Sequence, residues 1–317
     1  MKHQPEIALG YEDVYLVPNK CTLKSRRNVD TSYTLLKGDT TLHLDLPIIP
    51  ANMKSVVDPD TYEKYLHYGL MPIMHRFGLN RNPNTPNWRT ISIGVSDSEH
   101  QHLRDLALYK LYPAPHCICI DVAHGHADSV ARMIELIIKT FNPVPLIIAG
   151  NVTTPEGVKF LQDAGADMVK CGIGGGHVCS TRNKTGFHVP MFTAVMQCSE
   201  VATVPIIADG GIRENGDIAK ALVAGADLVM VGSLFAACTD SPAVIIDGKK
   251  EYYGSASAKN KGYNRNIEGF AIHLTPTMTI EEKVREIKQD LQSAISYSGG
   301  NDLYALDLAK IRYNIIK

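Results

Sequence analysis

A cysteine that follows a run of glycines is the clearest chemical signal in the sequence. Cys179 ends the stretch Gly172-Ile-Gly-Gly-Gly-His-Val-Cys, and the hydroxyls of Ser180 and Thr181 come directly after it. Glycines allow positive φ angles and let backbone amides approach a ligand closely. A thiol surrounded by such dipoles can become a nucleophilic thiolate. The stretch predicts either a reactive cysteine or a glycine-rich turn with an incidental buried thiol, and the rest of the chain must decide between them.

The composition is that of an ordinary soluble globular protein. The chain has 317 residues, of which 44% are hydrophobic and 21% charged, and its formal net charge is −1. A nearly neutral chain has no basic field that would attract nucleic acid or an anionic membrane surface. The N-terminus has no apolar signal core, and no apolar run is long enough to span a bilayer. We therefore expect a cytoplasmic protein with reduced cysteines that binds neither nucleic acid nor a membrane.

Short apolar runs alternate with amphipathic helical patterns along the chain. The runs are almost continuously apolar, which is typical of strands buried on both faces of a parallel sheet. The predicted strands cover residues 47–52, 71–75, 90–95, 117–121, 146–150, 168–172, 205–209 and 228–232. Eight strands that alternate with helices predict an α/β fold, a single (β/α)8 TIM barrel over residues 1–317. A doubly wound sheet is the alternative, although no Gly-x-Gly-x-x-Gly motif follows the first strand.

Start and stop signals for helices fall between these runs. Thr154 precedes Pro155, as expected for an N-cap residue followed by proline at the first helical position. The phrase Ala-Gly-Ala-Asp occurs twice, with its glycine at Gly165 and at Gly225, each time just before a predicted strand. Glycine at this place commonly ends a helix. The recurrence indicates repeated βα units.

The carboxyl ends of the predicted strands are unusually polar or rich in glycine. In a (β/α)8 barrel the functional site lies at these ends. Asp121 and Asp209 each close a strand, and Gly210-Gly211 and Gly232-Ser233 follow the last two strands. Backbone N–H groups at this place in a barrel commonly bind phosphate. Because a carboxylate would repel phosphate, Asp209 is predicted to accept hydrogen bonds from a sugar diol.

A series of phrases in a fixed order resembles the IMP dehydrogenase/GMP reductase family over nearly the whole chain. The first are Tyr11-Glu-Asp-Val, Pro50-Ala-Asn-Met, Met74-His-Arg-Phe, Asp121-Val-Ala-His-Gly-His and Ala149-Gly-Asn-Val. The others are Gly172-Ile-Gly through Cys179-Ser-Thr-Arg, Ala208-Asp-Gly-Gly-Ile-Arg, Val231-Gly-Ser-Leu-Phe-Ala, Tyr253-Gly-Ser-Ala-Ser and Gln292-Ser-Ala-Ile-Ser-Tyr-Ser-Gly-Gly. Each phrase alone is a modest signal, but their order along the chain is specific.

The resemblance implies a covalent intermediate between a cysteine and C2 of a purine. One branch of the family oxidises IMP with NAD; the other expels ammonia from GMP and takes a hydride from NADPH to give IMP. Three features favour the reductase branch. The chain has no room for a CBS-type insert, its only Arg-Tyr pair is Arg312-Tyr313 in the tail, and Glu268-Gly269 matches the reductase position of a catalytic glutamate. The implied activity is NADPH-dependent reductive deamination of GMP to IMP in purine nucleotide salvage.

The resemblance also implies roles for individual residues. Cys179 would attack C2, and Thr181 would relay a proton from Glu268 to the leaving amine. The implied substrate-binding residues are Asp209, Gly210, Gly211, Gly232, Ser233, Ser255, Ala256, Ser257, Arg265 and Gly269. The implied cofactor-binding residues are Ser25, Arg26, Arg76, Asp121, Val122, Ala123, Ile173 and Gly174. A monovalent cation, K⁺, would be held by Gly174, Gly176, Cys179 and Arg182.

The resemblance further implies a homotetramer, a catalytic loop at 172–186 and a mobile segment at 236–275. Gly175 and His177 depart from the usual residues of that loop, and polar residues expected after Gly186 are missing. The base and the sugar of the nucleotide, ribose or deoxyribose, therefore stay open. Other functions stay open too: a short IMP dehydrogenase that uses NAD, a nucleotide-binding regulatory protein without turnover, and a flavin-dependent barrel oxidoreductase.

Overall fold

The computed structural model describes residues 7–37, 40–77, 89–108, 115–262, 264–307 and 310–316. Its centre is a parallel sheet in the order β4-β10-β9-β8-β7-β6-β5. The strands are β4 (Ile48–Pro50), β5 (Thr90–Ile93), β6 (Cys117–Asp121), β7 (Leu146–Val152), β8 (Met168–Cys171), β9 (Ile206–Asp209) and β10 (Leu228–Val231). Each corresponds to an apolar run of the sequence, so the predicted α/β barrel is confirmed.

The predicted strand at 71–75 occupies the eighth position but is not a regular strand. Met71 N–H donates to the carbonyl of Ile48 at 3.4 Å, and Met74 N–H donates to the carbonyl of Thr90 at 3.0 Å. The segment therefore lies between β4 and β5, with an isolated bridge between Met74 and Ile91. Pro72 has no N–H to give to the ladder, which accounts for the irregular pairing.

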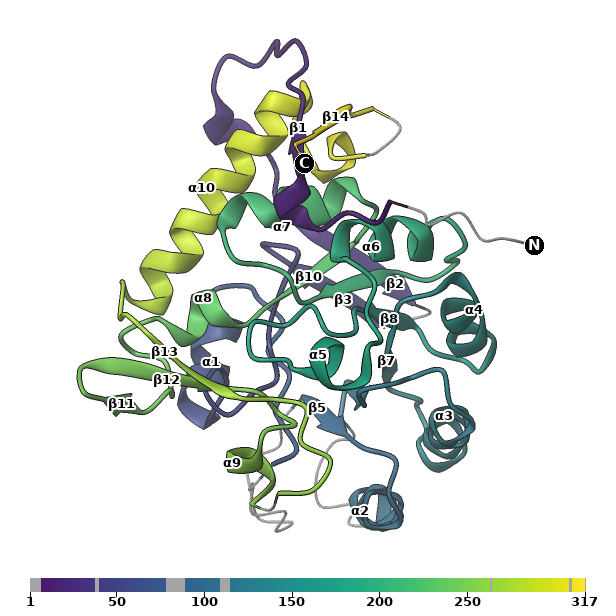
Figure 1. Cartoon of the computed structure of the whole chain (residues 1–317). Helices are drawn as coiled ribbons and strands as arrows, with labels where there is room; N and C mark the ends of the chain where they lie inside the picture. The colour runs from purple at the N-terminus through teal and green to yellow at the C-terminus, as the bar shows by residue number, and fades with distance from the viewer. Residues whose placement is uncertain are drawn as a thin grey trace.

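Helices cover the outside of the barrel (Figure 1). They are α1 (Pro59–His67), α2 (Asp97–Leu108), α3 (Asp128–Thr140), α4 (Pro155–Asp163), α6 (Met191–Ser199), α7 (Asn215–Val223), α8 (Ser233–Ala236) and α10 (Ile280–Ser298). The Thr154 hydroxyl caps α4 by accepting from Gly157 N–H. Gly165 and Gly225 follow the ends of α4 and α7 with φ of 106° and 105°, which only glycine adopts easily. Both predicted helix ends are confirmed.

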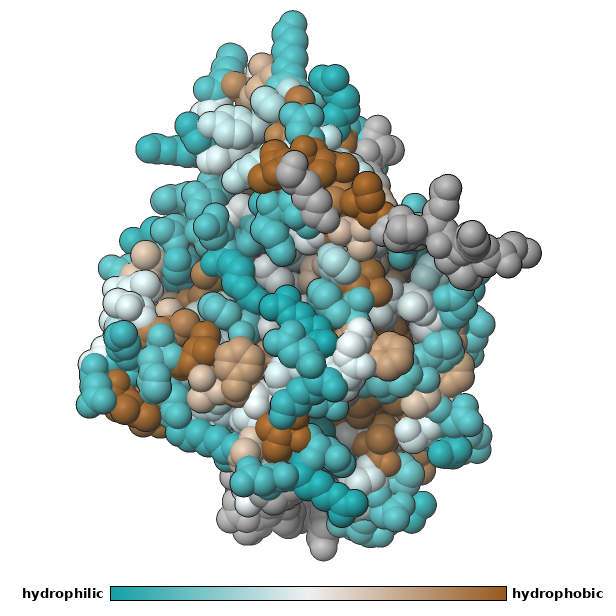
Figure 2. All heavy atoms as spheres, in the orientation of Figure 1, coloured by the Kyte–Doolittle hydropathy of each residue, from teal (hydrophilic) through white to brown (hydrophobic). Residues whose placement is uncertain are grey.

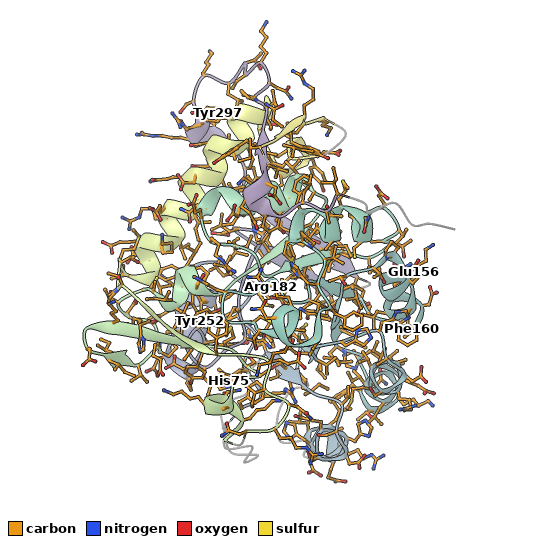
Figure 3. All side chains as sticks on the ribbon, in the orientation of Figure 1. His75, Glu156, Phe160, Arg182, Tyr252 and Tyr297 are labelled. Carbon is orange, nitrogen blue, oxygen red and sulfur yellow. The ribbon has the colours of Figure 1, made fainter. Side chains whose placement is uncertain are left out.

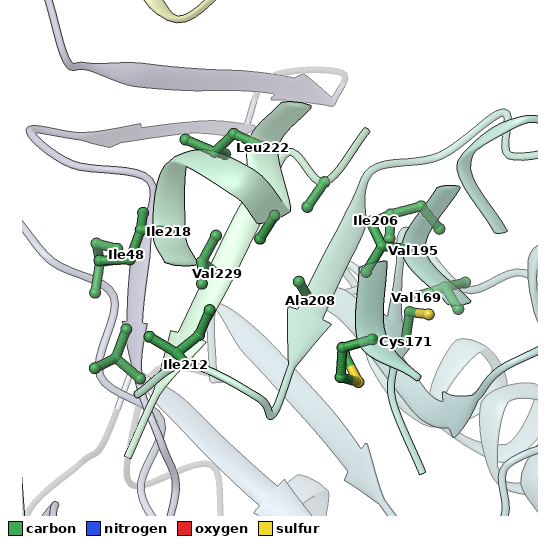
Figure 4. Close-up of a cluster of buried hydrophobic side chains, with 14 of the residues drawn as sticks. Ile48, Val169, Cys171, Val195, Ile206, Ala208, Ile212, Ile218, Leu222 and Val229 are labelled. Carbon is green, nitrogen blue, oxygen red and sulfur yellow. The ribbon is translucent and has the colours of Figure 1, made fainter. Parts of the chain in front are cut away.

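Alternate side chains of each strand point outward under the helices and inward to the barrel axis. In Figure 4, Ile218 and Leu222 of α7 pack over Ile48 and Val229 of the sheet, within the outer apolar layer. The inner layer is a separate apolar cluster that includes Cys119, Ile148, Met168, Ile207 and Met230. Toward the carboxyl ends the inner positions become polar, and this change marks the floor of the candidate site.

The remaining elements close the two ends of the barrel. The hairpin of β2 (Tyr33–Lys37) and β3 (Thr40–Leu44) packs Tyr33, Leu35 and Leu42 against the inner cluster. A small sheet of β11 (Ile245–Ile246), β12 (Lys249–Tyr253) and β13 (Ala271–Leu274) leads into the opposite end, with α9 (Ala258–Lys261) and α5 (Thr181–Thr185) nearby.

Two segments from opposite ends of the described chain lie side by side, because β1 (Val14–Leu16) pairs with β14 (Tyr313–Ile315). Three short 3-10 helices complete the described elements: η1 (Tyr11–Asp13), η2 (Arg26–Asn28) and η3 (Leu303–Ala305). Across the described ranges, no helix has the length and apolar character needed to cross a membrane.

Candidate active site

A cavity of about 330 Å³ opens at the carboxyl ends of the strands. Most of the residues singled out from the sequence line it. They are Arg76, Asp121, Val122, Ala123, Ile173, Gly174, Gly176, Cys179, Thr181, Asp209, Gly210, Gly211, Gly232, Ser233, Ser255, Ala256 and Glu268. They come from distant parts of the chain, and the barrel brings them together because parallel strands share one edge.

Three predicted residues lie just behind the cavity wall. Gly269 forms isolated bridges with Cys179 and with Ser257, so the segment that carries Glu268 is tied to the cysteine loop. Arg182 follows Thr181 in α5, and Figure 3 shows it near the centre of the view together with Tyr252. These residues shape the wall without belonging to the cavity lining.

Three other predicted residues are not brought to the cavity. Arg265 is exposed to solvent. Ser25 and Arg26 belong to the η2 region, where the Arg26 guanidinium donates to the hydroxyl of Ser293 in α10 at 2.9 Å. That region lies at the far end of α10, where Figure 3 labels Tyr297, well away from Arg182 and Tyr252. Within this chain, Ser25 and Arg26 do not contribute to the cavity.

A chain of three side chains connects the cysteine to a carboxylate. The Cys179 thiol donates to the Thr181 hydroxyl at 3.2 Å, and that hydroxyl donates to Oε2 of Glu268 at 2.6 Å. Backbone bonds hold the two ends together, because Ser180 N–H donates to the carbonyl of Glu268 at 2.9 Å. The arrangement can move a proton between the carboxyl and a group bound beside Cys179.

The loop before Cys179 folds closely against the end of β9. Gly172 has φ of 144°, and a Cβ there would lie 2.1 Å from the carbonyl oxygen of Asp209. A side chain at this position would collide with backbone, so glycine is required. His188 Nδ1 lies 2.7 Å from the carbonyl of Ile173, and Arg213 Nη2 donates to the carbonyl of Gly175 at 3.1 Å. Asn151 Nδ2 donates to the carbonyl of Gly172 at 2.6 Å, so side chains hold several carbonyls of the loop.

A buried lysine, which the sequence analysis did not single out, lies on the cavity floor. Lys170 Nζ donates to Oδ1 of Asp121 at 2.7 Å and to Oδ2 of Asp209 at 2.9 Å. Asn52 Nδ2 donates to Oδ2 of Asp121 at 3.0 Å, and Asn151 Nδ2 donates to Oδ2 of Asp209 at 2.8 Å. Side chains at or just after the carboxyl ends of β4, β6, β7, β8 and β9 therefore form one hydrogen-bonded network.

Several polar residues of the cavity lining had no role assigned from the sequence, among them Tyr252, Asn151 and His177. Burial raises the pKa of Tyr252, so its hydroxyl stays neutral, and it donates to the sulfur of Met53 at 3.3 Å. Oδ1 of Asn151 and Nδ1 of His177 are buried without a hydrogen-bond partner in the described structure. Burial, followed by the charge of Arg213, lowers the pKa of His177. Orphaned buried polar atoms beside a cavity indicate groups that a ligand can satisfy.

None of the seven cysteines is in a disulfide, which agrees with the reduced thiols expected from the sequence. In the parts of the chain that the structure describes, no three His, Cys, Asp or Glu side chains gather as a metal site would require. Cys179 is the cysteine that lines the cavity and has a hydroxyl partner.

Comparison with known proteins shows the family of the chain. Residues 89–315 match the model of the "IMP dehydrogenase / GMP reductase domain". A protein named GMP reductase from Lactococcus lactis subsp. cremoris (strain SK11) is 46% identical over 97% of this chain and 94% of its own length. One of the same name from Streptococcus pneumoniae (strain ATCC 700669 / Spain 23F-1) has the same identity and coverage. The chain belongs to the IMP dehydrogenase/GMP reductase family.

Proposed function

We propose that this chain is an NADPH-dependent GMP reductase, which converts GMP to IMP and ammonia. The observation that carries the proposal is the hydrogen-bonded chain from Cys179 through Thr181 to Glu268 beside the cavity. Deamination requires a nucleophile for C2 and an acid for the departing amine, and this chain supplies both. The relatives named GMP reductase match almost the full length and make the dehydrogenase alternative less favoured.

The protein's groups act in two stages. The Cys179 thiolate adds to C2 of GMP, and the C2–N bond breaks as Glu268 delivers a proton through Thr181, so that ammonia leaves and a covalent Cys179–purine thioimidate remains. NADPH, when bound, supplies the hydride that adds to C2. The bond from C2 to sulfur then breaks, Cys179 leaves as thiolate, and IMP is released.

The residues around the cavity suit a purine nucleotide. Gly210, Gly232 and Ser233 lie where barrels bind phosphate through backbone N–H groups, and Gly211, whose own N–H donates to the carbonyl of Gly175, lies beside them. A Cβ on Gly232 would lie 2.4 Å from the Tyr252 hydroxyl, so a larger residue would fill this corner. Asp209 would accept from the ribose. Ser255, Ala256, Ser257 and Gly269 are proposed to border the base. Arg265, which is exposed here, would contact the substrate only if its segment moved toward the cavity.

The same cavity has a second side that fits a nicotinamide cofactor. Asp121, Val122, Ala123, Ile173 and Gly174 line it, and Arg76 supplies a positive charge. The orphaned Oδ1 of Asn151 is a buried acceptor suited to an N–H donor of a ligand. We propose that these residues hold the nicotinamide end of NADPH. Ser25 and Arg26, which lie elsewhere on this chain, would contact the cofactor only from another copy of it.

A monovalent cation, K⁺, is proposed to steady the catalytic loop through the carbonyls of Gly174, Gly176, Cys179 and Arg182. The carbonyl of Gly174 accepts no hydrogen bond in the described part of the chain. Those of Gly176 and Arg182 each accept one, from Cys179 N–H and Gly186 N–H, which leaves a second lone pair. The donor set is therefore compatible with K⁺.

We propose that the protein is a cytoplasmic homotetramer, with all of residues 1–317 in one barrel domain. Support for self-association comes from apolar side chains on the surface where β1 pairs with β14. Tyr15 is 59% exposed, Ile315 53% and Ile316 51%, and Figure 2 shows a brown patch in this area. Loop 172–186 is proposed as the catalytic loop and residues 236–275 as a mobile segment.

The proposed function is tested by following the absorbance of reduced nicotinamide. Protein incubated with GMP and NADPH is expected to consume NADPH and to release IMP and ammonia in equal amounts. Parallel incubations with IMP and NAD, and with deoxyGMP and NADPH, separate the alternatives. Rapid reduction of NAD by IMP without turnover of GMP would contradict the proposal and would show that the protein is a short IMP dehydrogenase.

Asp209→Ala is expected to weaken GMP binding by about ten- to a hundredfold. A buried ribose diol would lose a charged acceptor, a loss of about 1.5–3 kcal/mol. Isothermal titration calorimetry with GMP measures the effect. The matched control is Asp163→Ala, an exposed carboxylate at the end of α4. Equal affinities for Asp209→Ala and the control would place the sugar elsewhere.

A further inference from the structure

Lys170 lies between two carboxylates that the proposed function assigns to different ligands. Its side chain is 1% exposed, whereas those of Asp121 and Asp209 are 20% and 22% exposed toward the cavity. The ammonium is thus covered by the two groups that it contacts. A lysine this deeply buried is rare unless it is paired, and here it is paired twice.

The sequence of the strands places these groups in one layer. Met168 points into the barrel, so Lys170, two residues later on β8, points inward as well. Gly150 of β7 lies between them in the sheet register, paired with Asp121 on one side and with Lys170 on the other. A Cβ on Gly150 would lie 2.6 Å from Cβ of Lys170. The glycine leaves the space through which the lysine reaches Asp121.

The groups that face the ammonium come from three strands. They are Cys119 and Asp121 of β6, Asp209 of β9 and the sulfur of Met230 on β10, which lies 4.0 Å from Nζ. Arg76, farther out, also acts on the charge of Asp121. Burial opposes the charge of Lys170, but the two carboxylates outweigh it and raise the pKa of Lys170 well above its usual value. Burial likewise opposes ionisation of Asp121, but Lys170 and the Asn52 hydrogen bond together lower its pKa.

The hydrogen bonds leave the two carboxylates with different free atoms. Both oxygens of Asp121 are occupied, one by Lys170 and the other by Asn52. Oδ2 of Asp209 accepts from both Lys170 and Asn151, while its Oδ1 accepts no hydrogen bond in the described structure. Asp209 therefore presents one unoccupied, fixed oxygen to the cavity.

We propose that Lys170 is a positioning residue whose ammonium balances the charges of Asp121 and Asp209 and, by hydrogen-bonding both, fixes them relative to each other. Asp209 lies on the proposed sugar side of the cavity and Asp121 on the proposed nicotinamide side. The contacts of Lys170 therefore fix the positions of the two ligand sites relative to each other. The identity of the two ligands rests on the proposed function. The charge coupling among the three side chains rests on their contacts alone.

Replacement of Lys170 by methionine removes the ammonium and keeps a similar side-chain volume, and it therefore tests the charge coupling. In Lys170→Met the two carboxylates share a buried site without a cation, so one of them is expected to take up a proton near neutral pH. The variant is expected to bind GMP about tenfold or more weakly than wild type at pH 8. In Lys170→Met/Asp121→Asn one negative charge is removed as well, and GMP affinity is expected to recover to within about threefold of Asp121→Asn.

Unfolding measured at several pH values supplies a readout that needs no ligand. In wild type, the lowered pKa of Asp121 contributes stability that is present above its unfolded value and is lost as the pH falls. In Lys170→Met one of the two carboxylates has a higher pKa in the folded state than in the unfolded state. Its contribution to stability has the opposite pH dependence, so the free energy of unfolding falls as the pH rises above about 4. The deficit relative to wild type is expected to grow between pH 5 and 8, and to stay constant with pH in the double variant.

The control is Lys139→Met, an exposed lysine of α3, 69% exposed and paired with Glu135. Two results would overturn the proposal: a loss of stability in Lys170→Met that does not depend on pH, or no recovery of GMP affinity in the double variant. Both are expected if Lys170 only fills space. Should Lys170→Met fail to fold, the double variant decides: it must fold and bind GMP as stated. If wild type does not bind GMP, the proposed function fails, and the unfolding series still tests the coupling.

Discussion

Cys179→Ala is expected to lower the rate of NADPH oxidation with GMP by at least about 10⁴-fold while GMP still binds. The thiol forms the covalent bond to C2, and no other cavity-lining side chain in the described structure is a cysteine. The residues proposed for phosphate and ribose, Gly210, Gly232 and Asp209 among them, lie at the ends of other strands. Calorimetry should therefore give a dissociation constant for GMP within about threefold of wild type.

The covalent step has its own readout. Wild type mixed with GMP in the absence of NADPH is expected to release ammonia up to the amount of enzyme and to gain the mass of the purine adduct. Cys179→Ala should show neither. Cys198→Ala, a buried cysteine of α6 outside the cavity, controls for the loss of a thiol. Turnover by Cys179→Ala at even a tenth of the wild-type rate would eliminate the covalent mechanism.

The barrel and the polar strand ends were predictable from the sequence because they depend on local pattern. Asp121 and Asp209 each close a continuous apolar run, and such a run predicts both a buried strand and the end at which its polar residue lies. Lys170 was missed for the same reason. A lysine within an apolar run has no visible partner, since its carboxylates come from β6 and β9, 49 and 39 residues away.

Other parts of the site depend on contacts that no local pattern contains. Thr181 and Glu268 are 87 residues apart, and only the family resemblance paired them before the structure placed them at 2.6 Å. Tyr252 belongs to β12, and its position against Gly232, the residue after β10, is a contact that the local sequence does not contain. Ser25 and Arg26 show the reverse case: the resemblance assigned them to the cofactor, but the fold of this chain keeps them beside α10.

Glu268→Gln is expected to slow the reduction of GMP by about 10²–10⁴-fold, the usual contribution of general acid catalysis. The amide keeps the shape of the side chain and can still hydrogen-bond Thr181, but it cannot deliver a proton to the leaving amine. The single-turnover rate of ammonia release from GMP, measured without NADPH, reports this step directly. Glu200→Gln, an exposed glutamate at the end of α6, is the matched control.

The rate of hydride transfer distinguishes a role of Glu268 as the acid from a purely structural role. Oxidation of IMP by NADP passes through the same thioimidate but expels no amine, so it needs no proton from Glu268. We expect this slow reverse reaction to lose less than about tenfold in Glu268→Gln, far less than the deamination loses. Thr181→Val, which breaks the 2.6 Å and 3.2 Å bonds of the relay, should match that pattern. Because the two residues act in one chain, the double variant should be little slower than either single one. An equal loss in both directions would instead make Glu268 a support of the cysteine loop, held there by its backbone bond to Ser180.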